Sequence, residues 1–399
     1  MRFLLFTRRV TTRRRGAVIA AQSNMTNINY DQFGPEMVVE TYDVKTKTRG
    51  ILVIDNMALG VGKGGIRMTP SVTVGEVSRL ARAMTWKNAL AGLPFGGAKS
   101  GIIFDPKHAT ANDKKNVIQS FSRAIKPLCP EKYVAGPDIN MGEKDMKWFV
   151  KANGQKKSAT GKPKKMGGLP HEYGSTGYGV VCAIKEAADF FGQDLKNFTV
   201  GIEGFGNVGT FAFKFLEELG AKVCAVADSK GVFYDPDGLK YKEAMDVKKK
   251  TGSVINCPIS VGSRREKLDV GGIFGLPVSL IVTAAFPDVI NENNAAGIKA
   301  KMIVEGANIS VTPEAEKRLF ERGVLVLPDI VANAGGVISS YAEWKGGYDK
   351  GKTFKLIKQK ITKSVREVLE AAREKKIMPR EAALAIARDK VLGAGLKNK

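Results

Sequence analysis

The sequence predicts an α/β protein of two domains. Its 399 residues, 43% hydrophobic and 26% charged, have an ordinary globular composition and exceed the usual length of one domain. In the second half, short apolar runs alternate with helical periodicity, which is the pattern of parallel strands joined by helices. A glycine fingerprint within residues 198–228, between a strand and a helix, indicates a Rossmann-type βαβ unit.

Mixed strands and helices are expected in the first half of the chain. Strands are predicted at residues 51–54, 101–104 and 132–135. Between the first two, Thr73 and Glu76 have the spacing of a helix capping box. An apolar helical stripe follows them, and Gly92 closes the helix. The first domain is therefore expected to be an α/β unit of its own.

A Gly- and Lys-rich segment, residues 152–169, predicts a loop that serves as a hinge between the domains. Its lysines are expected to form a solvated face. Regular elements follow: a helix at 177–190, a strand at 198–203, a helix at 207–219, a strand at 222–227, and buried strands at 279–282, 302–304 and 324–327. The apolar stripe of residues 353–376 predicts an amphipathic helix that docks on another part of the protein.

The turn at residues 204–209 carries the dinucleotide fingerprint. Gly204 permits a tight turn, Gly206 lets the backbone approach a pyrophosphate, and Gly209 lets helix and strand pack closely. Free N–H groups at the helix start, from Asn207 and Val208 onward, favour that anion. Glycines that serve only a turn are the weaker alternative, because the strand–helix–strand context is complete. The sequence thus predicts a nicotinamide dinucleotide cofactor and a dehydrogenase.

The choice between NAD and NADP stays open. Asp228 ends the second strand of the βαβ unit, where an acid can accept a hydrogen bond from the ribose 2′-hydroxyl of NAD. The same acid would repel the 2′-phosphate of NADP. Ser229 and Lys230 follow at once and could receive that phosphate.

Composition disfavours several kinds of site and partner. The chain has two histidines and four cysteines without a CxxC pair, which disfavours histidine acid–base chemistry and a metal centre and is typical of a reducing compartment. No apolar stretch is long enough to span a bilayer. The net charge of +23 fits a solvated lysine surface or attraction of anionic ligands. Because no aromatic-interleaved basic motif accompanies this charge, we expect no nucleic-acid partner. The lack of a long apolar stretch and the few histidines and cysteines likewise lead us to expect no membrane and no metal.

Six arginines and no acid stand in the first fifteen residues. This basic start could be a transit peptide, but it lacks the apolar core of a secretion signal. The favoured interpretation takes Met25 as the true start, so residues 1–24 are expected to be disordered or not translated. Without a credible targeting signal, the protein is expected in the cytoplasm.

Three lysines form the most informative constellation. Lys63 stands before the pair Gly64–Gly65, Lys87 borders the apolar stripe of a helix, and Lys99 is expected in a Gly-rich turn. Burying a lysine is costly unless it meets an anion, so the set suggests a pocket for a doubly anionic substrate. Lysines that snorkel from a helix and loops explain the spacing equally well. Asp138, just past a strand end, is a further candidate, although an isolated aspartate there more often forms a turn.

Taken together, the motifs resemble one family. The chain contains LARAMTWKNALAGLPFGGAKSGI, with KGGIR before it and GPDIN, GFGNVG, VEGAN and PDIVANAGGV after it, in the order found in the glutamate/leucine/phenylalanine/valine dehydrogenases. The resemblance covers about residue 31 to the C-terminus. It implies a substrate and oligomerisation domain, a Rossmann domain, C-terminal helices that return to the first domain, and a homohexamer. The implied reaction is reversible oxidative deamination of an L-amino acid to a 2-oxo acid and ammonia.

The resemblance also implies roles for individual residues. Lys99 matches a catalytic lysine that activates water, Asp138 an acid that shuttles protons, and Lys87 a lysine that holds the substrate α-carboxylate. The residues implied at the cofactor are Thr176, Ala284 and Asn308, and Asn333 is implied at the substrate.

Two positions indicate the substrate. In the glutamate members a lysine before the first Gly-Gly and a serine after the NAGG motif hold the side-chain carboxylate, and this chain has Lys63, beside Gly64 and Gly65, and Ser340 there. An unpaired cation would reject leucine. The resemblance therefore favours glutamate, 2-oxoglutarate and ammonium over leucine, valine or phenylalanine. The other alternative is a non-catalytic basic binding protein that kept only the fold.

The predicted domains span residues 25–176, 177–350 and 351–399, for the substrate domain, the Rossmann domain and the returning helices. The chain departs from the family at residues 167–174, where GGLPHEYG replaces a Gly-Gly-Ser that arginine follows. Ser100 and Ile309–Ser310 replace a usual Gly and Gly-Pro. These departures could alter closure of the cleft.

Overall fold

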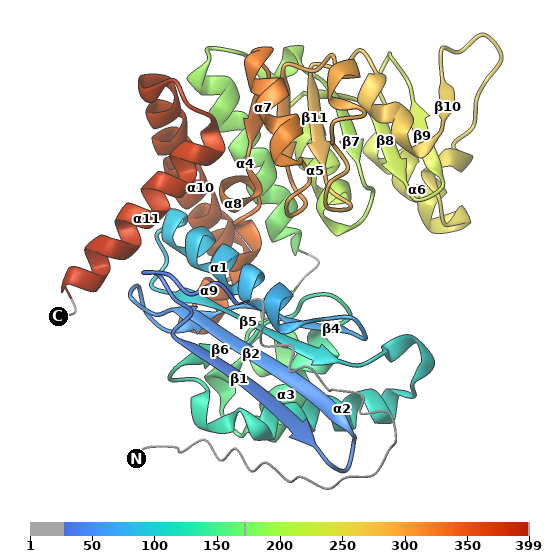
Figure 1. Cartoon of the computed structure of the whole chain (residues 1–399). Coiled ribbons are helices and arrows are strands. Elements are labelled where there is room, and N and C mark those ends of the chain that lie inside the picture. Colours follow the sequence, from blue (N-terminus) through green and yellow to red (C-terminus); the bar gives the residue numbers. More distant parts are fainter. Residues whose placement is uncertain (1–27, 171–172, 398–399) are drawn as a thin grey trace, which may run out of the picture.

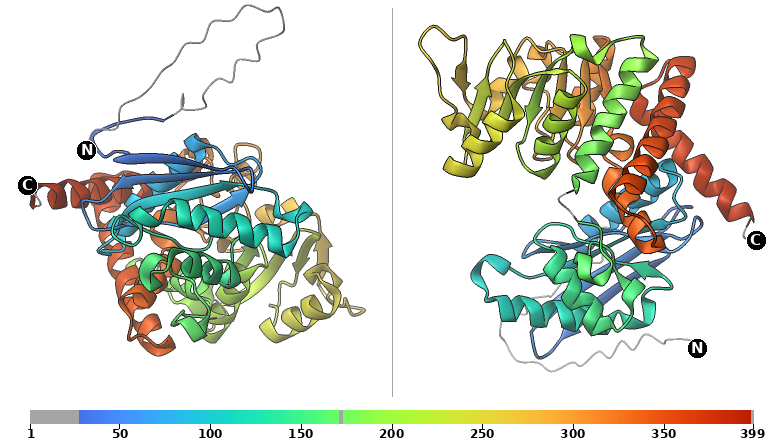
Figure 2. Two further views of the ribbon diagram at one scale, coloured as in Figure 1. Left: turned by 90° about the horizontal axis from the view of Figure 1, so that it is seen from below. Right: turned by 180° about the vertical axis from the view of Figure 1, so that it is seen from behind.

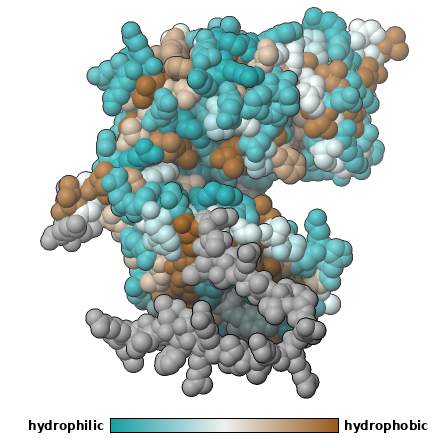
Figure 3. Space-filling view, viewed as in Figure 1, coloured by the Kyte–Doolittle hydropathy of each residue, from teal (hydrophilic) through white to brown (hydrophobic). Residues whose placement is uncertain are grey.

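The computed structural model describes residues 28–170 and 173–397, which form two lobes (Figure 1). The predicted leader, residues 1–24, lies outside the described residues. Within the described part, no helix is both long and apolar enough to cross a membrane. The space-filling view shows a mainly hydrophilic face whose outline is indented between the lobes (Figure 3).

The first lobe is a mixed sheet covered by helices on both faces. Its strands lie in the order β1 (Met37–Asp43), β2 (Thr48–Asn56), β5 (Gly96–Ile103), β3 (Gly62–Lys63) and β6 (Tyr133–Val134), and β4 (Ile66–Thr69) pairs with β5. The covering helices are α1 (Val74–Leu90), α2 (Ala111–Ala124) and α3 (Glu143–Asn153). Ile51 and Val53 of β2 pack with α1, whereas Leu52 and Ile54 pack with α2 and α3. The alternating pleat of one strand thus serves both layers.

The expected Gly-rich turn at Lys99 is wrong. Lys99 lies inside β5, opposite Val53 of β2. A Cβ at Gly97 would stand 2.0 Å from Thr85 Oγ1 of α1, and a Cβ at Gly96 would meet the backbone of β2 as closely. The two glycines therefore permit close approach of a helix and a strand, and they do not form a turn.

The second lobe confirms the predicted Rossmann-type fold. Its strand order is β10 (Glu266–Leu268), β9 (Gly231–Tyr234), β8 (Lys222–Asp228), β7 (Thr199–Glu203), β11 (Leu280–Thr283), β12 (Met302–Glu305) and β13 (Leu325–Leu327). Strands β8, β7, β11, β12 and β13 are mutually parallel. Strands β9 and β10 are antiparallel to their neighbours and were not expected. The accompanying helices are α4 (Ser175–Phe190), α5 (Asn207–Glu218), α6 (Tyr241–Thr251) and α7 (Pro313–Glu321).

The C-terminal segment connects the lobes through α8 (Asp329–Ala332), α9 (Gly335–Lys345), α10 (Lys350–Lys375) and α11 (Pro379–Lys397). Helix α10 packs along α4, and α11 packs against α1 of the first lobe (Figure 2). Ser364 Oγ of α10 donates to the Leu90 carbonyl at 2.6 Å, and Lys360 Nζ donates to the Gly92 carbonyl at 2.7 Å. The predicted return of the C-terminal helices to the first domain is confirmed.

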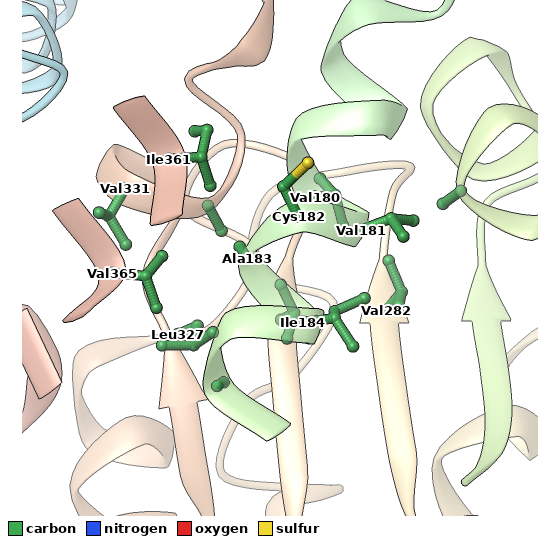
Figure 4. Close-up of a cluster of buried hydrophobic side chains, with 14 of the residues drawn as sticks. Val180, Val181, Cys182, Ala183, Ile184, Val282, Leu327, Val331, Ile361 and Val365 are labelled. Atoms are coloured by element: carbon green, nitrogen blue, oxygen red, sulfur yellow. The ribbon is translucent and has the colours of Figure 1, made fainter. Parts of the chain in front are cut away.

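Helix α4 is buried between the second sheet and α10. In Figure 4, Ile184 of α4 lies toward Val282 of β11 and Leu327 of β13, and Ile361 and Val365 of α10 close the opposite side. These side chains are almost completely buried. The packing holds α4 in place between the second sheet and the C-terminal helices.

A buried ion cluster ties α11 to the second sheet. Arg380 bonds Glu305 at 2.6 Å, Glu316 at 2.5 Å and Asp329 at 3.0 Å, and all three carboxylates are almost fully buried. Because one guanidinium serves three acids, its removal leaves buried charge uncompensated. We expect Arg380→Met to lower the free energy of unfolding by about 3–5 kcal/mol, seen as a fall in the urea and thermal midpoints.

The matched control for this prediction is Arg49→Met. Arg49 pairs with Glu40 on the surface, where such a pair contributes at most about 1 kcal/mol. Equal shifts for the two variants would show that the Arg380 cluster does not stabilise the fold.

Candidate functional site

Residues of both lobes meet at Lys87. This side chain, in the last turn of α1, donates from Nζ to Asn333 Oδ1 at 2.6 Å and to Asn308 Oδ1 at 2.9 Å. Asn333 follows α8 and is buried, whereas Asn308 follows β12 and is exposed. Burial lowers the pKa of Lys87, and Asp329 opposes that shift. Three residues from separate motifs thus form one hydrogen-bonded group, at the carboxyl end of the second sheet.

Two glycines bring Lys99 and Asp138 together. A Cβ at Gly64 would stand 1.6 Å from the Ala98 carbonyl oxygen, and a Cβ at Gly65 would stand 2.9 Å from Asp138 Cβ. Since no larger residue fits, the pair lets the chain pass between β5 and the loop after β6. Lys99 Nζ and Asp138 Oδ2 consequently lie 3.1 Å apart.

Lys63, in β3, is 3% exposed, and its Nζ donates to the Ala135 carbonyl at 2.8 Å. Among the described residues, no carboxylate lies within ion-pair distance of this ammonium. Burial lowers the pKa of Lys63 to about 7, a shift that Glu343 opposes and Lys162 and Lys99 reinforce. An anionic ligand would be bound favourably here, because an ammonium binds a carboxylate more strongly than it binds a neutral carbonyl.

Helix α9 binds the hinge segment near Lys63 through Glu343. Glu343 Oε1 pairs with Lys162 Nζ at 2.6 Å, and Oε2 accepts the N–H groups of Gly161 and Leu169 at 3.0 Å. The expectation that the hinge lysines are solvated is therefore wrong for Lys162, whose side chain is 5% exposed. Ser340, half-buried, lies one helical turn before Glu343.

The turn after β7 has the geometry of a phosphate-binding loop. Gly204 has a φ of +96°, and a Cβ there would lie 2.6 Å from the carbonyl carbon of Ala284. A Cβ at Gly209 would stand 1.8 Å from the Gly204 carbonyl oxygen, whereas a Cβ at Gly206 would meet nothing within 4 Å. The exposed or half-buried residues at the start of α5 are Gly206, Asn207 and Val208. The open helix start fits the pyrophosphate of a dinucleotide.

Both oxygens of Asp228 are bound by the protein itself. Oδ1 accepts hydrogen bonds from the Ser253 hydroxyl at 2.9 Å and from the Lys230 N–H at 3.0 Å. Oδ2 accepts the Val254 N–H at 2.9 Å. These contacts reduce the capacity of Asp228 to bind a ribose hydroxyl.

One cationic side chain, that of Lys248, interacts electrostatically with Asp228. Lys248, half-buried on α6, donates to the Phe205 carbonyl, and burial lowers its pKa while Asp228 opposes the shift. Ser229 and Lys230 are exposed beside it. The local arrangement offers donors and positive charge to an anion.

The remaining predicted cofactor residues lie where α4, α9 and β12 meet. A Cβ on Gly336 of α9 would stand 2.8 Å from Thr176 Oγ1, so Thr176 lies directly against that helix. Asn308 accepts a hydrogen bond from Asn333 Nδ2 at 3.0 Å. The next residue, Ile309, has a φ of +47°, which is strained for a β-branched side chain, and its N–H donates to Asp329 Oδ2 at 3.2 Å. The departure from the family's usual glycine thus places strain beside Asn308.

Four residues of this site carried no role in the sequence analysis: Arg67, Lys162, Lys248 and Glu343. Arg67 Nε lies 3.0 Å from Asp138 Oδ2. A signal existed for Arg67, because it stands two residues after Gly65, whose Cβ position faces Asp138, and so shares that face of an extended segment. Lys162 and Glu343 are distant in sequence, and no local spacing connects them.

Comparisons with known proteins agree with this geometry. A family model described as Glutamate/Leucine/Phenylalanine/Valine dehydrogenase matches residues 167–398. A second model, described as Glu/Leu/Phe/Val dehydrogenase, dimerisation domain, matches residues 20–154. Together they cover both lobes.

Individual relatives extend over most of the chain. It is 41% identical over 356 residues to the glutamate dehydrogenase of Aeropyrum pernix, which covers 85% of this chain and 84% of the relative. It is 39% identical over 353 residues to the NADP-specific glutamate dehydrogenase of Saccharolobus shibatae, covering 85% and 82%. The leucine-bound hetero-hexameric glutamate dehydrogenase of Thermus thermophilus superposes with a TM-score of 0.82 at 29% identity, covering 92% of this chain and 90% of that chain.

Proposed function

Because the chain belongs to the Glu/Leu/Phe/Val dehydrogenase family, we propose that it catalyses the reversible oxidative deamination of L-glutamate to 2-oxoglutarate and ammonia with NAD or NADP. The observation that carries this proposal is Lys63, a buried lysine bonded to a carbonyl. Leucine, valine or phenylalanine would leave this ammonium without a counter-charge, whereas the γ-carboxylate of glutamate would supply one.

Substrate binding uses both lobes. Lys63 and Ser340 bind the γ-carboxylate, and the glycines at 64–65 leave room for it. Lys87 binds the α-carboxylate and exchanges its bonds to the neutral amides of Asn308 and Asn333 for a stronger one to an anion. Asn333 remains beside the substrate as a neutral hydrogen-bonding group.

The dinucleotide is held by the fingerprint glycines and by Thr176, Ala284 and Asn308, and its nicotinamide, when bound, accepts a hydride from the substrate Cα. Asp138 accepts a proton from the substrate amino group, so that the nitrogen lone pair forms the imine as the hydride leaves. Lys99 first releases its own proton and then takes one from the water that adds to the imine carbon, and Asp138 returns its proton to the departing ammonia. Glutamate and water thus give 2-oxoglutarate and ammonium, with one hydride transferred and one proton released.

The preferred cofactor in this proposal is NADP. Asp228 is already bound by three protein donors, and Lys230 and Lys248 supply positive charge. We expect kcat/KM to be at least about tenfold higher with NADP, because a charged hydrogen bond contributes roughly 1.5–3 kcal/mol. Lys230→Met should lower kcat/KM for NADP by roughly tenfold and change that for NAD little.

Two further variants make the cofactor test specific. Asp228→Ser should weaken both cofactors, because the turn at 253–254 loses its acceptor. Lys317→Met, an exposed lysine on α7, is the matched control and should change neither. A wild-type preference for NAD, or equal losses with both cofactors in Lys230→Met, would contradict the assignment.

We also propose that the protein assembles as a homohexamer in the cytoplasm. The Thermus thermophilus relative is a hetero-hexamer, and the N-terminal family model is described as a dimerisation domain. The four free cysteines are buried, which suits a reducing compartment. Light scattering should give six times the chain mass of 43.1 kDa.

Absorbance at the reduced-nicotinamide band tests the proposed reaction. With 2-oxoglutarate, ammonium and NADPH or NADH, oxidation of the cofactor should require both other reactants. No turnover with either cofactor would favour a binding protein that kept only the fold.

A further inference from the structure

Asp138 is held through one of its two oxygens. Arg67 Nε lies 3.0 Å from Oδ2, and Lys99 Nζ lies 3.1 Å from the same oxygen. Within residues 28–170 and 173–397, Oδ1 accepts no hydrogen bond. Two cations on one oxygen fix the rotation of the carboxylate and leave the other oxygen available to a ligand.

Arg67 is itself fixed at its far end. Its Nη1 lies 2.6 Å from Glu76 Oε1, in the first turn of α1. The side chains of Arg67 and Asp138 are 17% and 20% exposed, so solvent screens their pairing only partly. A planar guanidinium bound at both ends holds its Nε in one place, which a flexible lysine would not do.

We propose that Arg67 is a positioning residue for the deamination reaction: anchored by Glu76, it orients Asp138 so that Oδ1 meets the substrate amino group. This inference rests on the proposed function of Asp138 as the group that exchanges protons with that nitrogen. Lys99 is already assigned to the water that adds to the imine carbon, so Arg67 is the group that is left to hold the carboxylate in place.

The same contact keeps Asp138 ionised. Burial alone would raise the pKa of Asp138, but Lys99 and Arg67 outweigh burial and hold the pKa below its ordinary value. The charged and titratable groups around this carboxylate are Arg67 of β4, Lys99 of β5, Lys87 of α1 and Tyr133 of β6. Removing Arg67 takes away one of the two bonded cations, so Asp138 should become protonated at higher pH.

The experiment measures kcat, KM for glutamate and the pH profile of kcat/KM in Arg67→Met, Arg67→Lys and Asp138→Asn. Arg67→Met should lower kcat by roughly ten- to a hundredfold, the cost of a small misplacement of a reacting group. Its KM should stay within about threefold of wild type, because the carboxylate-binding lysines are intact. The acid limb of the pH profile should move to higher pH.

Arg67→Lys separates charge from geometry. It keeps a cation but cannot bond Asp138 and Glu76 in the same way, so the acid limb should stay near that of wild type while kcat recovers only in part. This variant also decides the question if Arg67→Met does not fold, since a wild-type kcat in Arg67→Lys would overturn the positioning role. Arg49→Met, which removes a surface arginine from an ion pair, is the control for loss of an arginine elsewhere in the lobe.

The variants distinguish a failure of the proposed function of Asp138 from a failure of the positioning role of Arg67. If Asp138→Asn keeps a wild-type kcat, the proposed function of Asp138 is wrong. If Asp138→Asn is inactive while Arg67→Met keeps the wild-type kcat and acid limb and loses only thermal stability, Arg67 is merely structural and this inference alone is overturned.

Discussion

Replacing Lys99 by methionine should lower kcat for glutamate deamination by roughly a thousandfold, the scale of a general acid–base contribution. The lysine lies inside β5, 3.1 Å from Asp138, so its loss removes the group that activates water and a cation beside the carboxylate. KM for the cofactor and the thermal midpoint should change little, because β5 is held by its neighbours on both sides. Steady-state kinetics and cofactor titration measure these quantities.

The double variant Lys99→Met/Asp138→Asn is the sharper form of this test. Because the two side chains handle protons as one unit, the double variant should be no slower than the slower single variant. Additive losses, or a Lys99→Met enzyme within tenfold of wild type, would contradict the assignment of Lys99 and Asp138 as a joint acid–base pair.

Replacing Lys63 by leucine should change substrate specificity. The variant should lose roughly a thousandfold or more in kcat/KM for glutamate, because the γ-carboxylate would be desolvated without its cation. For norvaline or leucine, which bring no such carboxylate, the change should be tenfold or less. The comparison requires kcat/KM for the three amino acids in both enzymes.

Ser340→Ala is the companion variant. It removes a neutral hydroxyl from the same proposed subsite, so kcat/KM for glutamate should fall less than in the Lys63 variant, by roughly tenfold. Glutamate should remain the preferred substrate. Equal losses on glutamate, norvaline and leucine in the Lys63 variant would remove the basis for glutamate as the substrate.

Periodicity and turn chemistry predict much of the second lobe. The strand and helix flanking Gly204 and Gly209 have a complete local signature, and the parallel strands appear as continuous apolar runs. The antiparallel strands β9 and β10 are short: β9 is apolar and buried but only four residues long, and β10 is a mostly exposed run of three residues. Gly96 and Gly97 misled the prediction because glycine serves close packing as readily as it serves a turn.

The predicted site residues come from motifs, and the contacts among them come from the fold. Sequence spacing suggested Lys63, Lys87 and Lys99 as a set, yet it could not show that Lys87 reaches Asn333 across the junction. It offered Asp228 as a possible ribose ligand beside Ser229 and Lys230, yet it could not show that the turn at 253–254 donates to both carboxylate oxygens. Tertiary contacts of this kind depend on distant segments, and a single sequence contains no period that encodes them.

The most direct test of the central claim is the ratio of kcat/KM for 2-oxoglutarate to that for 4-methyl-2-oxopentanoate, the oxo acid of leucine, in the wild-type enzyme with saturating ammonium and NADPH. If Lys63 binds a γ-carboxylate, the ratio should be roughly a thousand or more, because only 2-oxoglutarate pairs with the buried ammonium. A ratio near or below one would mean that Lys63 does not select the substrate and that the enzyme acts on an apolar amino acid.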